Sequence, residues 1–144
     1  MKHPMYVTAD DAVKAVRTGD HIHLSSVASV PHILIESLCR RADAGEVRDL
    51  HFHHFHTEGP APYAEPKYEG IFFDQGFFIG PNVRADANAG YADYLPVHLS
   101  ESQKLYRSGA LRCDVAMVQV SLPDENGMFS LGTSVDCSLA AVES

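Results

Sequence analysis

Short apolar runs alternate along this chain with segments whose apolar residues recur at helical spacing, and glycines divide the two kinds of segment. The pattern predicts strands at residues 21–26, 47–55, 76–79, 94–99 and 115–120. It also predicts helices at residues 8–19, 29–45, 82–89 and 100–109, and a last helix capped by Asp136 or Ser138. Repeated strand–helix units build an α/β fold, so we expect a mostly parallel sheet flanked by helices.

Local signals refine this pattern at three places. Ser100 followed by Gln103 is a capping box for a helix, and residues 126–127 (Asn-Gly) are a strong signal for a hairpin turn. The last helix has no glycine, proline or basic turn to end it before Ser144. Because a parallel sheet normally continues with a strand after such a helix, the sequence predicts a domain that is incomplete at its C-terminal end.

Charge and composition exclude several classes of protein. The chain has 19 acidic residues against 11 Lys and Arg, a net charge of −8, and no basic run of the kind that nucleic-acid binding requires. Its apolar runs are far shorter than the roughly 20 residues of a membrane helix. Three cysteines without CxxC spacing favour reduced thiols in a cytoplasmic protein. We therefore expect neither a nucleic-acid partner nor a membrane partner.

Two junctions between a strand and a helix are candidate anion sites, because free backbone N–H groups meet the helix dipole there. Residues 24–29 are small enough to let a ligand approach the backbone. Residues 79–84 include Gly80, which permits a turn, and Asn82, which can cap a helix or donate a hydrogen bond. Ordinary helix capping explains each junction equally well when it is taken alone. GxGxxG, P-loop and GxSxG motifs are absent from the sequence.

Nine histidines are the unusual feature of the composition, and four of them lie within residues 51–56. In strands they form same-face pairs: His21 with His23, His51 with His53, and His54 with His56. Such pairs on adjacent strands are able to hold zinc or copper. No carboxylate or cysteine completes a ligand set by local spacing, so we favour strand-end histidines that hydrogen-bond a loop or a ligand. A histidine-rich metal-binding module remains an alternative.

The segment 57–70 is rich in proline, glycine and tyrosine. A loop of this length inside a compact domain is often functional. Glu58 begins the central part of this loop, residues 58–63, and its carboxylate is a candidate nucleophile.

Six segments, read in order, resemble one known family. They are residues 19–20 with the strand and small-residue turn that follow, then 56–63, 78–84, 90–101, 107–111 and 114–137. Together they resemble the N-terminal domain of the acetyl-CoA hydrolase/transferase family, and most closely the 4-hydroxybutyrate or butyrate type of CoA-transferase.

The resemblance implies an α/β domain of the CoA-transferase superfamily at residues 1–144, whose second catalytic domain is absent from this chain. Family members pass CoA from an acyl-CoA to a small carboxylic acid in a ping-pong reaction. A glutamate of the C-terminal domain forms a glutamyl-CoA thioester, so the chain alone should be inactive. The implied substrates are acyl-CoA and a carboxylate, without a metal. The implied protein partner is a second copy or the C-terminal half.

The resemblance also implies a site at three turns. Backbone N–H groups of Ser26, Val27 and Ala28 would lie near the thioester oxygen, although relatives often carry glycine in that turn. The carboxylate side of the site would be lined by His54, His56, Glu58, Gly80 and Asn82. An acyl-CoA hydrolase on the same fold is the alternative enzyme.

Overall fold

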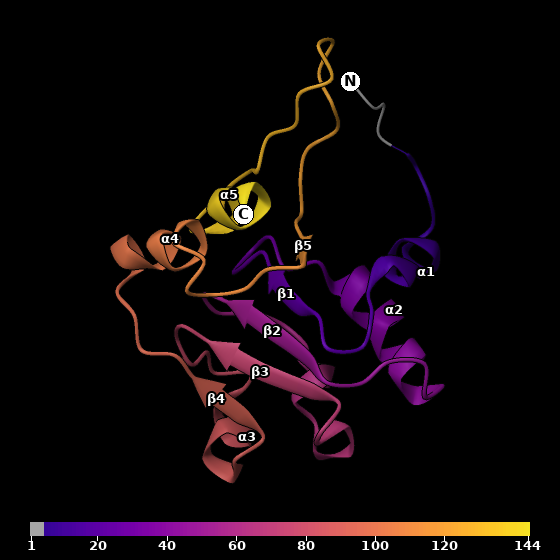
Figure 1. The fold of residues 1–144 in the computed structure, drawn as a ribbon, viewed down its shortest axis with the longest axis vertical. Coiled ribbons are helices and arrows are strands. Elements are labelled where there is room, and N and C mark those ends of the chain that lie inside the picture. The colour runs from indigo at the N-terminus through magenta and orange to yellow at the C-terminus, as the bar shows by residue number, and fades with distance from the viewer. Residues whose placement is uncertain (1–4) are drawn as a thin grey trace.

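Five parallel strands form the central sheet (Figure 1), in a computed structural model that describes residues 5–144. The strands are β1 (His21–Leu24), β2 (Leu50–His54), β3 (Phe72–Gly76), β4 (Ala92–Tyr94) and β5 (Val115–Met117). They lie in the order β4-β3-β2-β1-β5, and every neighbouring pair is parallel. The expected α/β fold with a mostly parallel sheet is confirmed.

Helices cover both faces of the sheet (Figure 1). One face carries α2 (His32–Asp43), together with α1 (Ala9–Ala12) and the 3₁₀ turn Val13–Ala15. The other face carries α4 (Leu99–Arg107) and α5 (Ser138–Glu143). Helix α3 (Arg84–Ala89) packs beside β4, and the 3₁₀ turns Pro62–Ala64 and Pro66–Tyr68 lie in the long loop before β3.

The two faces of β1 and β2 differ in chemistry because successive strand residues point to opposite sides. Ile22 and Phe52 are fully buried in the apolar core beside α2. On the other face, the ring of His23 contacts Tyr106 of α4 and Ser138 of α5. The strand pairing aligns His23 with His53, so the expected same-face arrangement of these histidines is confirmed.

Two strands form at positions other than those expected from the sequence. The third strand is Phe72–Gly76 rather than 76–79, because Asp74, a polar residue, lies in the core and hides the apolar pattern. The fourth strand is Ala92–Tyr94 rather than 94–99, since Pro96 has no N–H to continue a ladder.

The helix caps expected for α4 and α5, in the second half of the chain, are also wrong. Helix α4 begins at Leu99, and the Ser102 hydroxyl donates to the Leu99 carbonyl in place of a capping box. At α5 the N-cap position is held by Cys137 and not by Asp136 or Ser138. At the N-terminus, in contrast, the Thr8 side chain accepts from the Asp11 N–H at 3.1 Å, which confirms that cap.

The expected hairpin turn forms at the tip of a long arm between β5 and α5 that extends away from the sheet (Figure 1). Ser121 N–H donates to the Ser130 carbonyl at 2.9 Å. At the tip, the Asp124 side chain accepts from the N–H groups of Asn126 and Met128 at 2.9 and 2.8 Å. The arm has no regular strand.

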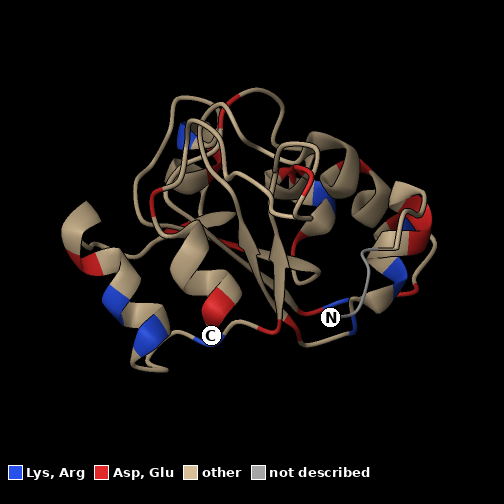
Figure 2. Cartoon of the chain, turned by 90° about the horizontal axis from the view of Figure 1, so that it is seen from above, with Lys and Arg blue, Asp and Glu red and all other residues tan. Residues whose placement is uncertain are grey.

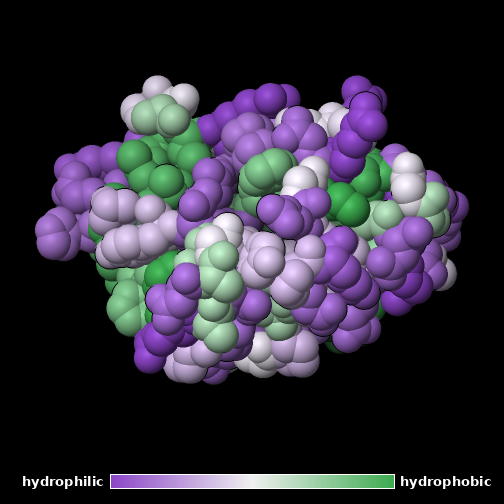
Figure 3. Space-filling view, turned by 90° about the horizontal axis from the view of Figure 1, so that it is seen from below, coloured by the Kyte–Doolittle hydropathy of each residue, from purple (hydrophilic) through white to green (hydrophobic). Residues whose placement is uncertain are grey.

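Charge and hydropathy are dispersed over the surface. Lys and Arg occur as separate segments rather than as one patch (Figure 2). The face shown in Figure 3 is largely hydrophilic, with smaller separate hydrophobic areas. Within residues 5–144, every helix is too short or too polar to cross a membrane.

Candidate functional site

Three loops meet where β1, β2 and β3 end. The chain order reverses at β1, the first strand of this group, since β2 to β4 are added on one side of it and β5 on the other. In open α/β sheets such a reversal, at the carboxyl ends of the strands, is where ligands bind. Val27 and Thr57 form an isolated parallel bridge beyond β1 and β2, so the first two loops are in direct contact.

The turn after β1 is bonded to the loop after β2 through two hydrogen bonds. The Phe55 N–H donates to the Ser26 hydroxyl at 3.0 Å, and the Val27 N–H donates to the His56 carbonyl at 3.0 Å. The amide of Val27 is therefore occupied. Ala28 is exposed, and its amide has no hydrogen-bond partner within residues 5–144. Among residues 5–144, neither the Ser26 nor the Ala28 amide has a hydrogen-bond partner, but Ser26 is buried. Ala28 is therefore the exposed one of the two free amides.

Asn82 joins the loop after β3 to the loop after β2. Its side-chain amide donates to the Thr57 hydroxyl at 3.0 Å and to the Gly59 carbonyl at 3.2 Å. The Thr57 hydroxyl also shares a 2.7 Å hydrogen bond with the Tyr63 hydroxyl, which anchors the loop in the core. At Gly80 a Cβ would lie 2.7 Å from the Asn82 amide oxygen, so the close approach of these loops requires glycine there.

His56 and Glu58 lie at the surface of this junction. His56 Nε2 and Glu58 Oε1 are 3.7 Å apart, and the glutamate side chain is 60% exposed. The half-exposed ring of Phe78 packs against His56 edge to face. The polar side chains of Ser26, Thr57 and Asn82 hold the loops together. The exposed Glu58 carboxylate is left able to meet a ligand.

His54 is placed differently from the other expected site residues. Its side chain is fully buried, and its Nε2 lies 2.6 Å from Oδ1 of Asp74, which is also buried. It packs beneath Gly76, where a Cβ would lie 3.2 Å from the ring. The structure thus makes His54 a support under the loops, whereas Ser26 to Ala28, His56, Glu58, Gly80 and Asn82 lie together as the sequence predicts.

The histidines nearer the amino ends of the strands stack on one another. The rings of His21 and His51 are 4.4 Å apart and nearly parallel, and Phe73 continues the stack on β3. His21 Nδ1 and His53 Nε2 are 2.9 Å apart, a hydrogen-bond distance. His21, His51 and His53 are not part of a group of three metal-binding side chains. Within residues 5–144, the one such group is His23, Asp136 and Cys137.

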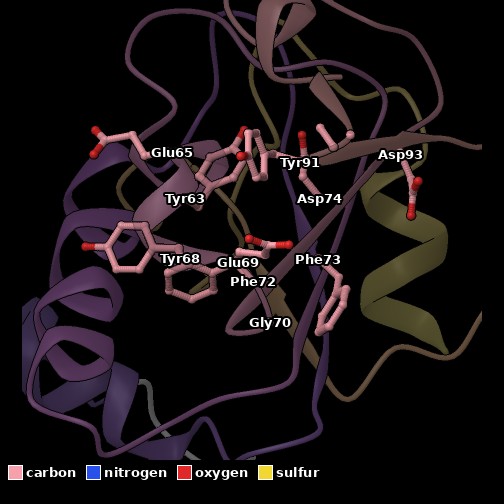
Figure 4. A pocket seen from close by; sticks show the side chains of 12 residues that line it. Tyr63, Glu65, Tyr68, Glu69, Gly70, Phe72, Phe73, Asp74, Tyr91 and Asp93 are labelled. Atoms are coloured by element: carbon pink, nitrogen blue, oxygen red, sulfur yellow. The ribbon is translucent and has the colours of Figure 1, made fainter. Parts of the chain in front are cut away.

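A separate hollow of about 210 Å³ lies beside β3 and β4 (Figure 4). Its walls combine tyrosines with carboxylates: Tyr63, Tyr68, Tyr91, Glu65, Glu69, Asp74 and Asp93. Carboxylates disfavour an anion nearby, so this hollow is a poor site for an anionic substrate. The loops at the carboxyl ends of the strands remain the better candidate.

Sequence reasoning missed three residues of the junction. Thr57, Tyr63 and Phe78 were not singled out, although Thr57 is the bridge partner of Val27 and the hydrogen-bond partner of Asn82. Thr57 and Tyr63 do lie in the loop that was expected to be functional. Only their contacts with other strands distinguish them from neighbouring loop residues.

The N-terminal domain model of the acetyl-CoA hydrolase/transferase family matches residues 3–144. A succinyl-CoA:acetate/propanoyl-CoA:succinate CoA transferase of Fasciola hepatica is 34% identical over 93% of this chain and 28% of its own length. The 4-hydroxybutyrate coenzyme A transferase of Clostridium kluyveri is 30% identical over 96% of this chain and 32% of its own.

Solved structures give the same result for the fold. RipA from Yersinia pestis matches 88% of this chain and 31% of its own with a TM-score of 0.77 at 24% identity. A 4-hydroxybutyrate CoA-transferase from Porphyromonas gingivalis matches 95% of this chain and 30% of its own with a TM-score of 0.73 at 25% identity. The chain spans about 30% of the length of these proteins. Because the model of the N-terminal domain matches residues 3–144, this chain belongs to the acetyl-CoA hydrolase/transferase family and corresponds to that domain.

Proposed function

We propose that this chain is the N-terminal part of an acyl-CoA:carboxylate CoA-transferase of the 4-hydroxybutyrate, butyrate or acetate type. Its substrates are then an acyl-CoA and a small carboxylic acid. The observation that carries the proposal is the junction of three loops at the carboxyl ends of β1, β2 and β3, in a chain whose relatives are named CoA transferases.

The reaction needs a glutamate that lies outside this chain. Its carboxylate attacks the thioester carbon, forms a mixed anhydride and releases the CoA thiolate. The thiolate then attacks the glutamyl carbonyl, which gives a glutamyl-CoA thioester and frees the first carboxylate. The acceptor carboxylate repeats these two steps in reverse order and leaves as the new acyl-CoA.

This chain's contribution is one wall of the site. The exposed amide of Ala28, which has no hydrogen-bond partner within residues 5–144, would donate to the thioester oxygen as negative charge grows on it. Losing one such donor costs about 3 kcal/mol of transition-state stabilisation. Glu58 beside His56 would act on the carboxylate side, where an ionised glutamate repels a second carboxylate unless a proton or cation lies between them.

A chimeric enzyme tests this proposal. This chain replaces the matching N-terminal segment of the Clostridium kluyveri 4-hydroxybutyrate CoA transferase, and CoA transfer from butyryl-CoA to acetate is measured. We expect transfer to be restored, and Glu58→Gln to lower kcat/KM at least about 10-fold. Glu65→Gln, an exposed change in the same long loop but outside the junction, serves as the matched control.

Two further measurements keep the test decisive. Release of free CoA without any acceptor would identify a hydrolase, the alternative on the same fold. If the chimera does not fold, a photoreactive acyl-CoA is added to the 144-residue chain. Cross-links within residues 26–28, 56–58 or 80–82 support the proposal, and cross-links confined to the hollow beside β3 and β4 contradict it.

The location and assembly of the protein are further parts of the proposal. Cys39, Cys113 and Cys137 are all free thiols, and two of them are buried. Free thiols are typical of reducing compartments, which supports a cytoplasmic location. The open edge of β5 supports pairing with a second copy or with the C-terminal half.

A further inference from the structure

Three side chains with metal-binding atoms meet where α5 packs against β1. His23 comes from β1, while Asp136 and Cys137 come from the residues just before α5, more than 100 positions later in the chain. One ligand atom from each lies within 4.8 Å of the other two. Around a tetrahedral zinc ion, nitrogen and sulfur ligands are about 3.5 Å apart, so a small inward movement suffices.

The three residues differ in how deeply they are buried, and this difference suits a metal site. His23 and Cys137 are fully buried, whereas Asp136 is partly exposed and leaves a path to solvent. The Asp136 Oδ2 atom is itself buried and has no hydrogen-bond partner within residues 5–144. A buried carboxylate oxygen without a partner is costly, and a cation beside it removes that cost.

His23 has the second hydrogen bond that metal-binding histidines need. Its Nδ1 lies 3.0 Å from the Tyr106 hydroxyl, and its Nε2 lies 2.9 Å from the Ser138 hydroxyl. Ser138 directly follows Cys137, so Nε2 faces the chain segment that carries the other two ligands. A proton on Nδ1 donated to Tyr106 would orient the ring and leave the Nε2 lone pair for a metal.

We propose that His23, Asp136 and Cys137 form a binding site for a zinc ion, with the Ser138 hydroxyl or a water molecule as fourth ligand. A mixed set of imidazole, carboxylate and thiolate is typical of zinc. On binding, the Cys137 thiol gives its proton to solvent, the sulfur forms a bond to zinc, and Nε2 exchanges its Ser138 hydrogen bond for the metal. The ion would fix α5 to β1. The proposal does not depend on the transferase reaction.

Zinc binding to the purified 144-residue chain tests the site. The chain is stripped with a chelator, titrated with zinc chloride, dialysed and analysed for metal. We expect about one zinc per chain. Replacing zinc with cobalt(II) should produce a thiolate-to-cobalt charge-transfer band together with the visible bands of a tetrahedral ion.

Matched variants distinguish this site from adventitious binding. Cys137→Ser should abolish the charge-transfer band, and Asp136→Asn should weaken zinc binding. Cys113→Ser, which changes another thiol near α4, should leave both unchanged. Tyr106→Phe keeps the ring but removes the hydroxyl that faces Nδ1, and should weaken binding about 10-fold.

Each result of these zinc-binding experiments either supports the proposed site or overturns it. Stoichiometric zinc that depends on Cys137 and Asp136 supports the site, as does a rise in thermal stability with zinc that Cys137→Ser removes. Failure of the chain to retain zinc overturns the proposal. Zinc that is retained equally by Cys137→Ser, or that requires His51 and His53 instead, also overturns it.

Discussion

Val27 has a φ of 53°, which is unusual for a β-branched residue. Placing such a side chain in the left-handed region costs about 1–2 kcal/mol, which glycine avoids. Val27→Gly should therefore raise the free energy of unfolding by about 0.5–1 kcal/mol, after allowance for the greater entropy of glycine in the unfolded chain. Urea denaturation measures this. Val120→Gly, at a partly exposed valine without a positive φ, should instead destabilise the chain, and a similar loss in both variants would contradict the strain argument.

Asp74 is a buried carboxylate whose side-chain hydrogen bond is made to His54. Both Asp74 and His54 are almost completely buried, 2.6 Å apart. Asp74→Ala leaves a buried imidazole nitrogen unpaired and should lower the free energy of unfolding by about 3 kcal/mol. Asp93→Ala, at an exposed carboxylate of the same hollow, should change it by less than about 0.5 kcal/mol. Equal effects in guanidinium denaturation would show that the buried pair contributes little.

At the scale of elements, the loops after β2 and β3 are held together by the fit between Gly80 and Asn82. Gly80→Ala places a Cβ 2.7 Å from the Asn82 amide oxygen and 3.2 Å from the Thr57 carbonyl, and overpacking of this kind costs about 1–3 kcal/mol. Gly80→Ala should therefore destabilise the chain. Combining it with Asn82→Ala, which removes the nearest atom, should cost less than the sum of the two single changes. Strict additivity in this double-mutant cycle would rule out the contact as the cause.

The sequence predicts an element correctly where its buried residues are apolar. The prediction fails where a polar residue is buried. Strands β1, β2 and β5 and helix α2 lie within their expected ranges, because apolar runs and glycine ends mark them. The expected position of strand β3 is wrong because its buried Asp74 pairs with His54. His54 belongs to another strand, and a local sequence pattern cannot show such a partner. The loops of the site were expected together because parallel strands end at one edge, but the burial of His54 again depends on a contact between strands.

At the scale of the whole molecule, residues 5–144 do not enclose the Glu58 carboxylate, which is 60% exposed. We expect the chain, incubated with acyl-CoA and borohydride, to keep every glutamate unmodified by mass spectrometry. Borohydride would reduce a glutamyl-CoA thioester to an alcohol, and a carboxylate 60% open to water lacks the dry pocket that forms one. The chimera described above is the positive control. A label on Glu58 would make this chain a catalyst by itself.

The edge of the sheet at β5 predicts how the chain behaves at high concentration. β5 is bonded to β1 on one side only. Apolar side chains are exposed on the arm that follows β5, at Leu122 and Met128, and on α5, at Val142. Unpaired strand edges and exposed apolar groups find partners. We expect concentration-dependent association in sedimentation velocity, reduced by Leu122→Lys. A monomer at all concentrations would contradict this expectation.

The alternation of histidine and apolar residues in β1 and β2 limits where this chain tolerates insertions and deletions. Shifting β2 by one residue would turn Phe52 toward α4 and α5 and place His53 in the apolar core beside α2. A single-residue insertion within β2 therefore has no harmless register to adopt. The loop at residues 57–70 and the arm at 118–135 have no such constraint of parity. Length should consequently vary among relatives in those two segments, while β1 and β2 keep their spacing.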